Sequence, residues 1–239
     1  MMLTKQFGEP VVGWVPPRAP DAAVLIGRFV RLERLDADAH AGDLYRANAA
    51  DDAIWDYLPY GPFASAAGYH RWMRDITSGS DPVFYALRNT ETGHLGGVAS
   101  YLRITPAAGT IEVGHINLAP EMQRTRAATE AMYLMMAWVF AAGYRRYEWK
   151  CDARNLPSRR AAERLGFQYE GTFRQAAVVK GRNRDTAWFA VIDKDWPTLR
   201  EAYEAWLAPG NFTAEGQQRQ SLADLTRLQR VSSDPTAAR

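Results

Sequence analysis

The sequence predicts a mixed α/β fold, with an α+β sheet that is mostly antiparallel and carries helices on both faces. Three consecutive segments have the composition of strands and are separated by short stretches of turn residues, which favours antiparallel pairing. These segments are 83–88, 95–104 and 110–118. Further along, an apolar helix at 126–142 leads into a strand at 144–151, and this order predicts a parallel crossover connection.

The N-terminal elements follow from local signals. Residues 1–22 contain four prolines and two glycines, too many for a helix or an interior strand, and so predict an extended arm. The alternation of charged and apolar residues at 28–34 predicts a strand. Asp36 and Ser65 are expected to cap the two helices that follow this strand.

The C-terminal half predicts further elements and a tail. The elements are a helix at 156–165, strands at 167–179 and 184–193, and a helix at 195–207. Residues 209–239 are polar, although the spacing of Leu222, Leu225 and Leu228 is compatible with a short helix. We therefore expect an extended N-terminal arm (1–22), one domain (23–208) and a polar C-terminal tail (209–239).

Composition and charge argue against several classes of protein. The 29 Lys and Arg residues almost balance the 27 Asp and Glu residues, so the net charge of +2 gives no reason to expect nucleic acid binding. The one cysteine, Cys151, excludes an intramolecular disulfide, and the four histidines lack ligand spacing, so we expect no metal. No apolar run of about 18 residues predicts a membrane span, and no secretory signal is visible. The cytoplasm is therefore the expected compartment.

Two junctions between a strand and a helix indicate where a ligand would bind. The strand at 110–118 leads into the N-terminus of the apolar helix, where free backbone N–H groups and the helix dipole favour a phosphate. One strand later, Asn155 and Ser158 begin a short helix, within an arginine cluster at 154–164 that serves an anionic ligand or forms a solvated face. Ligands bind beyond the carboxyl ends of parallel strands, so both junctions predict one cleft.

The region from about residue 28 to 196 resembles the GNAT superfamily of N-acetyltransferases and, within it, the RimJ/RimL-like branch. The matching segments are IEVGH at 111–115, QRTRAATEA at 123–131, NLPSRRAAERLGFQYEG at 155–171 and VKGRNRDTAWF at 179–189. They occur in the order expected for the family. The resemblance implies the acyl-CoA N-acyltransferase fold, with a splayed pair of parallel strands, and direct acetyl transfer to a primary amine.

The resemblance also implies that acetyl-CoA binds in a V-shaped gap between the strands at 110–118 and 144–151. The residues expected to bind it are Asn117, Leu118, Gln123, Arg124, Thr125, Arg126, Ala127, Ala128, Asn155 and Ser158. The loop of the family has a glycine where this chain has Arg126, and many relatives have glycine in place of Arg124. Arg126 either lends its guanidinium to a phosphate or obstructs the loop.

Direct transfer needs a base, because amines are protonated at neutral pH, and an acid for the departing thiolate. Glu112 is the candidate base, with a solvent-exposed charge at the strand edge as the alternative. Ser158 is the candidate acid, or it only satisfies a backbone amide of its helix. Asn155 is expected to position the cofactor or the neighbouring strand, and a backbone N–H near Asn117 or Leu118 to stabilise the oxyanion. Further candidates for the base are His115, Asp152 and Glu148.

The acceptor amine is left open by the sequence. The aromatic side chains of Trp55, Tyr57, Tyr60 and Phe63 either line an acceptor pocket or pack in the core. Three functions are compatible with the motifs: acetylation of a small amine, acetylation of a protein N-terminus, and a non-catalytic CoA-binding or interaction module with a degenerate phosphate loop. A homodimer is also compatible with the sequence.

Overall fold

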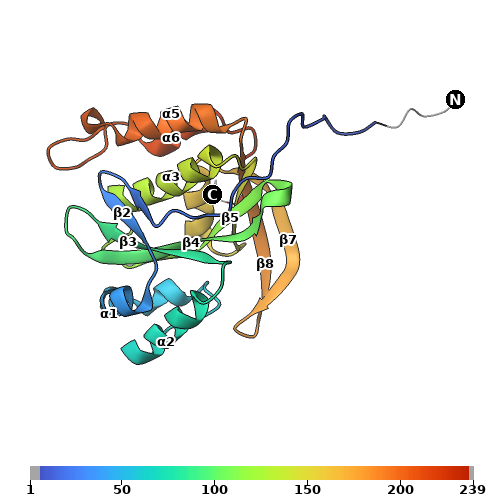
Figure 1. The fold of residues 1–239 in the computed structure, drawn as a ribbon. Coiled ribbons are helices and arrows are strands. Elements are labelled where there is room, and N and C mark those ends of the chain that lie inside the picture. The colour runs from blue at the N-terminus through green and yellow to red at the C-terminus, as the bar shows by residue number, and fades with distance from the viewer. Residues whose placement is uncertain (1–5, 237–239) are drawn as a thin grey trace.

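The computed structural model describes residues 6–236, and an eight-stranded sheet runs through this part of the chain (Figure 1). Its order is β1-β2-β3-β4-β5-β6-β8-β7. The strands are β1 (Val24–Ile26), β2 (Val30–Arg34), β3 (Val83–Asn89), β4 (Leu95–Thr105), β5 (Thr110–Leu118), β6 (Arg146–Asp152), β7 (Gln168–Val179) and β8 (Arg182–Ile192). Among them, β5 and β6 pair in parallel and all other neighbours pair antiparallel, which confirms the predicted mixed sheet.

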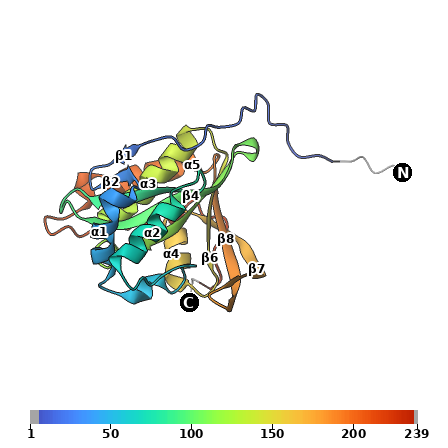
Figure 2. The same ribbon diagram turned by 60° about the horizontal axis from the view of Figure 1, so that its bottom comes forward.

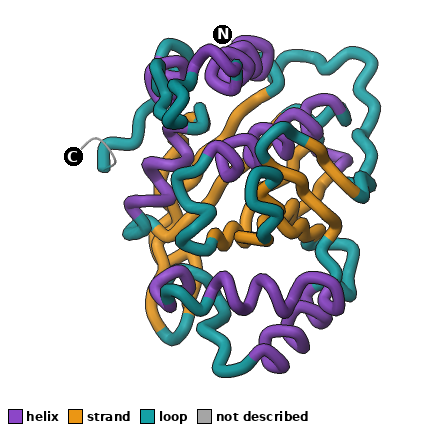
Figure 3. The backbone as a smooth tube through the Cα atoms, turned by 90° about the vertical axis from the view of Figure 1, so that its left-hand side faces the viewer, coloured by secondary structure: helices purple, strands orange, loops and turns teal. Residues whose placement is uncertain are grey.

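Helices cover both faces of the sheet, as the sequence predicts (Figures 1 and 3). They are α1 (Ala37–Asn48), α2 (Ala66–Ile76), α3 (Arg126–Ala141), α4 (Leu156–Arg164), α5 (Trp196–Leu207) and α6 (Leu222–Arg227), with short 3-10 turns η1 (Asp52–Trp55), η2 (Pro106–Ala108) and η3 (Pro209–Asn211). One apolar cluster joins α1 and α2 to one face, and a second joins α3 and α4 to the other. Outside the second layer, α5 packs against α3, and α6 packs against α4 and α5.

The helices begin and end where the local signals indicate. The carboxylate of Asp36 accepts a hydrogen bond from the amide of Ala39 at 2.8 Å, and the hydroxyl of Ser65 accepts one from the amide of Gly68 at 3.1 Å. Both predicted N-caps are thereby confirmed. Gly143 follows α3 with a φ of 93°, in the left-handed conformation predicted for the residue after a helix.

The two ends of the chain contact the domain at particular points. Within the arm, the Trp14 ring lies over Gly109, where a Cβ would be 2.4 Å from it, while residues 6–13 extend away from the domain (Figure 2). Strand β1 follows the arm and was not predicted, because three residues are too few to show an alternation. At the other end, Leu222 and Asp234 are both buried. None of the described helices is long and apolar enough to cross a membrane.

The parallel strands β5 and β6 diverge halfway along their length. Their pairing runs from Thr110 opposite Arg146 to Val113 opposite Trp149, whereas β5 continues to Leu118 and β6 to Asp152. The register of β4 against β5 also shifts at this point. His115, at the shift, has a φ of 50°, which is the signature of a β-bulge that bends β5 away from β6. The predicted splayed pair is therefore present, and the bulge explains it.

Candidate active site

The gap between the diverging strands is bordered by the N-termini of α3 and α4. The loop before α3 leaves β5, and the loop before α4 leaves β6, so both helices begin at the carboxyl ends of the two parallel strands. A site at this place has backbone amides on one side and the side chains of both strands on the other. The predicted convergence of the two junctions is therefore what the topology produces.

The loop before α3 presents its backbone amides. Thr125 caps the helix, since its hydroxyl oxygen accepts a hydrogen bond from the amide of Ala128 at 3.1 Å. The Gln123 side chain donates to the carbonyl oxygen of Leu118 at 3.0 Å and so ties the loop to the end of β5. Among the described residues, no acceptor is bonded to the amides of residues 124–127. Free donors at a helix N-terminus favour an anion such as a phosphate.

The two arginines of this loop behave differently. Arg124 has a φ of 61°, so its backbone adopts the left-handed conformation that glycine takes most easily. Arg126 is the first residue of α3, and its guanidinium forms an ion pair with Glu91 at 2.7 Å. The same guanidinium lies 4.5 Å from the ring centroid of Phe29 and 5.1 Å from that of Phe212. Its charge is therefore already compensated, and it needs no phosphate as a partner.

The start of α4 holds Ser158 in a fixed position. The side-chain oxygen of Asn155 accepts a hydrogen bond from the Ser158 amide at 3.1 Å, so Asn155 is the N-cap of the helix. The Ser158 hydroxyl oxygen accepts a hydrogen bond from the indole nitrogen of Trp149 at 3.1 Å. Burial raises the pKa of the adjacent Cys151 thiol to about 11, although Ser158 partly offsets this effect. Cys151 is therefore protonated at neutral pH, whereas the Ser158 hydroxyl can still donate its own proton.

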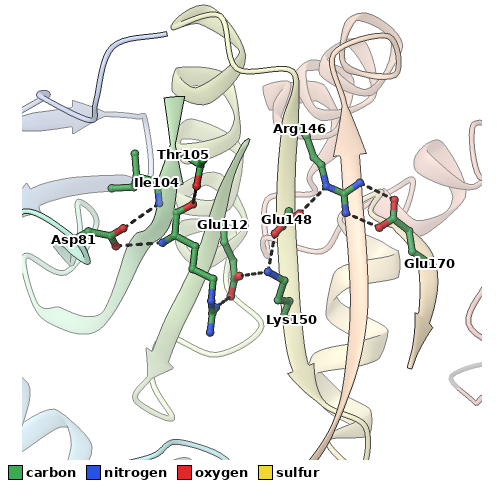
Figure 4. Close-up of polar contacts among 9 residues, drawn as sticks. Asp81, Ile104, Thr105, Glu112, Arg146, Glu148, Lys150 and Glu170 are labelled. Atoms are coloured by element: carbon green, nitrogen blue, oxygen red, sulfur yellow. Dashed lines mark hydrogen bonds and ion pairs between the residues drawn. The ribbon is translucent and has the colours of Figure 1, made fainter. Parts of the chain in front are cut away.

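Glu112 belongs to a chain of alternating charges on the sheet face opposite α3 (Figure 4). Its carboxylate is buried and accepts a hydrogen bond from Arg103 at 2.7 Å, and it lies 2.8 Å from the ammonium group of Lys150. Lys150 is also 2.7 Å from Glu148, which contacts Arg146 at 2.6 Å. The solvent-exposed alternative for Glu112 is thus wrong. We call these residues, together with Glu170 bonded to Arg146, the charge ladder.

Each charge within the ladder has an opposite neighbour. Burial alone would raise the pKa of Glu148, but hydrogen bonds from Lys150 and Arg146 outweigh it and lower that pKa. The ammonium group of Lys150 also lies 3.7 Å from the ring centroid of Trp188 on β8. Asp81 accepts hydrogen bonds from the backbone amides of Arg103 and Ile104, which fixes the outer end of the ladder.

His115 lies at the bulge and points into an aromatic cluster. Its Nδ1 is 3.1 Å from the hydroxyl of Tyr60, and the two rings stack with centroids 5.7 Å apart. Burial, aided by the charges of Arg103 and Arg184, lowers the pKa of His115 to about 4. Its imidazole is therefore neutral at pH 7 and is a weak base.

The aromatic stretch before α2 packs in the core and also makes contacts toward the gap. Trp55 is buried and packs edge-on against Phe63, as core residues do. Tyr60 instead reaches His115, and the Tyr57 hydroxyl donates to the carbonyl oxygen of Arg154 at 3.2 Å. A cavity of about 210 Å³ lies behind this stretch, but no residue of β5 or β6 lines it. It is lined by Tyr45, Asn48, Ala49, Asp52, Trp55, Phe63 and Tyr69.

Several buried polar atoms on the ladder face have no hydrogen-bond partner among the described residues. They are both side-chain atoms of Asn117, Nε of Arg184 and the indole nitrogen of Trp188. Such atoms are costly unless water or a ligand satisfies them. Asn117 was predicted for its backbone, whereas Arg184, Trp188 and Lys150 were missed. The alternation along β6 and β8 could have placed these three on one face, but it does not reveal which partners they lack.

Comparisons with known proteins agree with this geometry. A family model described as acetyltransferase (GNAT) domain matches residues 30–168. A GCN5-related N-acetyltransferase from Brucella melitensis is 45% identical with a TM-score of 0.88, over 90% of this chain and 99% of that chain. A probable acetyltransferase of the GNAT family from Chromobacterium violaceum is 40% identical with a TM-score of 0.77, over 82% of this chain and 100% of that chain.

A more distant structure shares the fold alone. It is the microcin C7 self-immunity acetyltransferase MccE, solved in complex with acetyl-CoA and AMP. The identity is 18% and the TM-score 0.62, over 70% of this chain and 93% of that chain. No curated protein matches the sequence.

Proposed function

Because the chain belongs to the GNAT family of acetyltransferases, we propose that it transfers an acetyl group from acetyl-CoA directly to a primary amine. The protein is an acyltransferase, and acetyl-CoA is the donor substrate of its family. The observation that carries the proposal is the divergence of β5 and β6 beside free amides at the start of α3. We assign the protein to the RimJ/RimL-like branch, acting in the cytoplasm, on the basis of its sequence motifs.

The residues at the gap fit acetyl-CoA. The free amides of residues 124–127 would hold the pyrophosphate, with Gln123 keeping the loop against β5. The backbone of Asn117 and Leu118, on the part of β5 that pairs with β4 but no longer with β6, would bond the thioester arm and supply the N–H for the oxyanion. This binding mode uses no arginine side chain, so the loop can work without the glycines of its relatives.

Ser158 is proposed as the general acid. Its oxygen is occupied as an acceptor by the Trp149 indole, so the hydroxyl proton is directed elsewhere and is available to the leaving thiolate. Asn155 acts through Ser158, because its side-chain oxygen accepts a hydrogen bond from the Ser158 amide and so fixes the first turn of α4. Asn155 is thus a positioning residue.

Glu112 is proposed as the base that receives the proton of the ammonium group. It is a buried carboxylate on β5, close to the bulge. Its carboxylate is paired with Arg103 and Lys150, so a proton that it accepts displaces one of these ion pairs. The base role therefore requires that the incoming ammonium group itself weakens the contact with Arg103 or Lys150.

Turnover with a panel of amines tests the function. We expect acetyl-CoA at about 100 times its Kd to raise the free energy of unfolding by about 2.7 kcal/mol. We also expect at least one amine to release free CoA thiol and to gain an acetyl group, as detected by mass spectrometry. Binding without turnover on any amine would favour a non-catalytic CoA-binding module. No shift in Tm at millimolar acetyl-CoA would refute the acetyltransferase.

The pH profile of Glu112→Gln tests the base. The variant should lose most activity near neutral pH and recover at high pH, where the amine deprotonates without help. Glu148→Gln is the matched control, since it removes the other carboxylate partner of Lys150. If Glu112→Gln keeps the wild-type profile, or if Glu148→Gln changes it equally, the base is another group.

A further inference from the structure

Arg184 is a cation without a counter-ion in the part of the chain that the structure describes. Its Nε is buried and has no hydrogen-bond partner, and the guanidinium makes no ion pair with any described residue. Two other cations nearby are paired: Lys150 contacts two carboxylates, and Arg159 is paired with Asp234. A buried polar group in this state needs a partner from outside the chain.

The position of Arg184 is next to the reacting end of the gap. It lies on β8 two residues before Thr186, which is opposite Asp152 at the end of β6. The backbone between them is fixed, because the amide of Ala153 donates to the carbonyl oxygen of Asp185 at 2.8 Å. Strand alternation puts Arg184 on the same face as Trp188, which covers Lys150. Arg184 therefore extends the ladder face beyond the end of β6.

The charge of Arg184 affects the pKa of one residue on each of the two diverging strands. Its charge contributes to the lowered pKa of His115 on β5, after burial and Arg103. It also opposes the effect of burial on the pKa of the Cys151 thiol on β6. These effects agree with the strand register in placing the guanidinium toward the bulge at His115 and the end of β6.

The acidic groups near Arg184 are used elsewhere. Asp185 accepts hydrogen bonds from the amide of Gln175 and the side chain of Asn183. One carboxylate oxygen of Asp152 accepts a hydrogen bond from the amide of Arg154 at 2.8 Å. The carboxylates of the charge ladder are matched by its own cations (Figure 4). Among the described residues, no carboxylate forms an ion pair with Arg184.

We propose that Arg184 binds a carboxylate of the acceptor, and that the acceptor is an α-amino acid. This inference depends on the proposed acetyltransferase function. A guanidinium binds a carboxylate through two parallel hydrogen bonds, and in an α-amino acid the carboxylate is two bonds from the amine. Arg184 would therefore hold the acceptor while the amine faces Glu112. A polyamine would bring a second ammonium group toward Arg184, which like-charge repulsion disfavours.

The reaction balances with these groups. The amine nitrogen forms a bond to the acetyl carbonyl carbon, and the bond from that carbon to sulfur breaks. The ammonium group loses two protons in total, the first to Glu112. One proton ends on the CoA thiol, supplied through Ser158, and the other is released to solvent. The products are an N-acetylamino acid and CoA.

Paired acceptors and matched variants test the proposal. The probes are a mixture of L-methionine, L-phenylalanine, L-leucine and L-threonine, the mixture of their carboxamides, and spermidine, with thiol release as the readout. Wild type should prefer the acids over the amides by ~10–100-fold in kcat/KM, the effect of one charged hydrogen-bonded pair. Arg184→Gln should lose this preference through KM for the acids, and Arg184→Lys should keep part of it. Arg182→Gln, which removes an exposed arginine from the same strand, should leave the preference unchanged.

Other outcomes would overturn the proposal. Equal use of acids and amides by the wild type, or a preference for spermidine, would refute the carboxylate site. An equal loss on acids and amides in Arg184→Gln would assign Arg184 to the oxyanion or thiolate instead.

If no amine is acetylated, the proposed acetyltransferase function fails, but the carboxylate site can still be tested by ligand binding. Stabilisation of the wild type by the N-acetylated amino acids, lost in Arg184→Gln, would keep the carboxylate site. No stabilisation would reject it.

Discussion

Two arginines on opposite sides of the sheet, Arg159 and Arg184, contrast a structural charge with a binding charge. Arg159, in the first turn of α4, is paired by two nitrogens with the carboxylate of Asp234 and donates a third hydrogen bond to the carbonyl oxygen of Ala153. Among the described residues, Nε of Arg184 has no hydrogen-bond partner, and no carboxylate forms an ion pair with its guanidinium. A paired buried charge fixes local geometry, whereas a charge without an ion pair inside the chain can bind a ligand without first breaking one. We call the surroundings of Arg159, which fix the position of α4, the paired region. We call the surroundings of Arg184 and His115, where a ligand is proposed to bind, the unpaired region.

The region around Arg159 extends the contrast to the C-terminal segment. The Asp234 amide donates to Glu163 at 2.6 Å, and the Gln168 side chain bonds the backbone of residues 229, 231 and 232. The segment thereby fastens α4, the helix that carries Ser158. Two polar atoms on this side, the Tyr147 hydroxyl and Nε of Arg230, have no hydrogen-bond partner between residues 6 and 236, so the pairing is dense but not complete.

Breaking the ion pair between Arg159 and Asp234 should have the largest effect on the free energy of unfolding. Asp234→Ala leaves the guanidinium of Arg159 buried without a counter-ion, which costs about 3–5 kcal/mol of unfolding free energy. Thermal or urea unfolding measures the loss. The double variant Arg159→Met with Asp234→Leu should recover most of it, because an apolar pair needs no compensation. Glu215→Ala, an exposed change in the same segment, should have little effect, and an equally stable Asp234→Ala would show that the segment is not anchored.

Protonation of His115, in the unpaired region, should have the second largest effect on the free energy of unfolding. The folded pKa of His115 is about 4, below the unfolded value near 6.5, so the unfolded chain binds the proton first as pH falls. The stability contributed by the neutral imidazole is complete above pH 6.5 and is lost toward pH 4. Between pH 7 and 5 this loss is about 2 kcal/mol.

A variant isolates this contribution. His115→Asn keeps a residue that tolerates positive φ, and it should remove about that amount of pH dependence from the unfolding free energy. His94→Asn changes an exposed histidine and serves as the control. Equal pH dependence in wild type and His115→Asn would mean that His115 is not titrated on unfolding.

Ser158 connects the two regions, since the anchored helix carries it into the gap. Ser158→Ala should lower kcat by ~10–100-fold with little change in acetyl-CoA affinity, because proton donation to the thiolate matters in the transition state. The Trp149 indole would lose its acceptor, so a small loss of stability is expected as well. Measuring kcat and Tm together separates the two effects. A destabilised variant with full turnover would leave Ser158 as a helix residue only.

The sequence predicts the features that local signals encode, and it fails where distant segments meet. The caps at Asp36 and Ser65 were confirmed, because each depends on residues within a few positions. The resemblance located the splayed strands, but neither it nor the periodicity predicted the bulge at His115. The absence of a partner for Arg184 is a property of several strands together, so no pattern within one strand reveals it.

Arg126 is the sharpest case and gives the smallest expected effect. The sequence suggested that its guanidinium contacts a phosphate or blocks the loop, but the group is bonded to Glu91 and lies between Phe29 and Phe212. Like Arg159, it is a paired arginine, so Arg126→Ala should change the Kd for acetyl-CoA by less than ~3-fold. Its lost contacts should instead cost roughly 1 kcal/mol of stability, from a partly exposed ion pair and the aromatic faces. Calorimetry with acetyl-CoA and a melting curve measure the two quantities, and Glu91→Ala should reproduce the stability loss without affecting binding. A 10-fold or larger weakening of acetyl-CoA binding in Arg126→Ala alone would show that the guanidinium leaves Glu91 for the phosphate, and pairing in the free protein would then not distinguish structural from binding arginines.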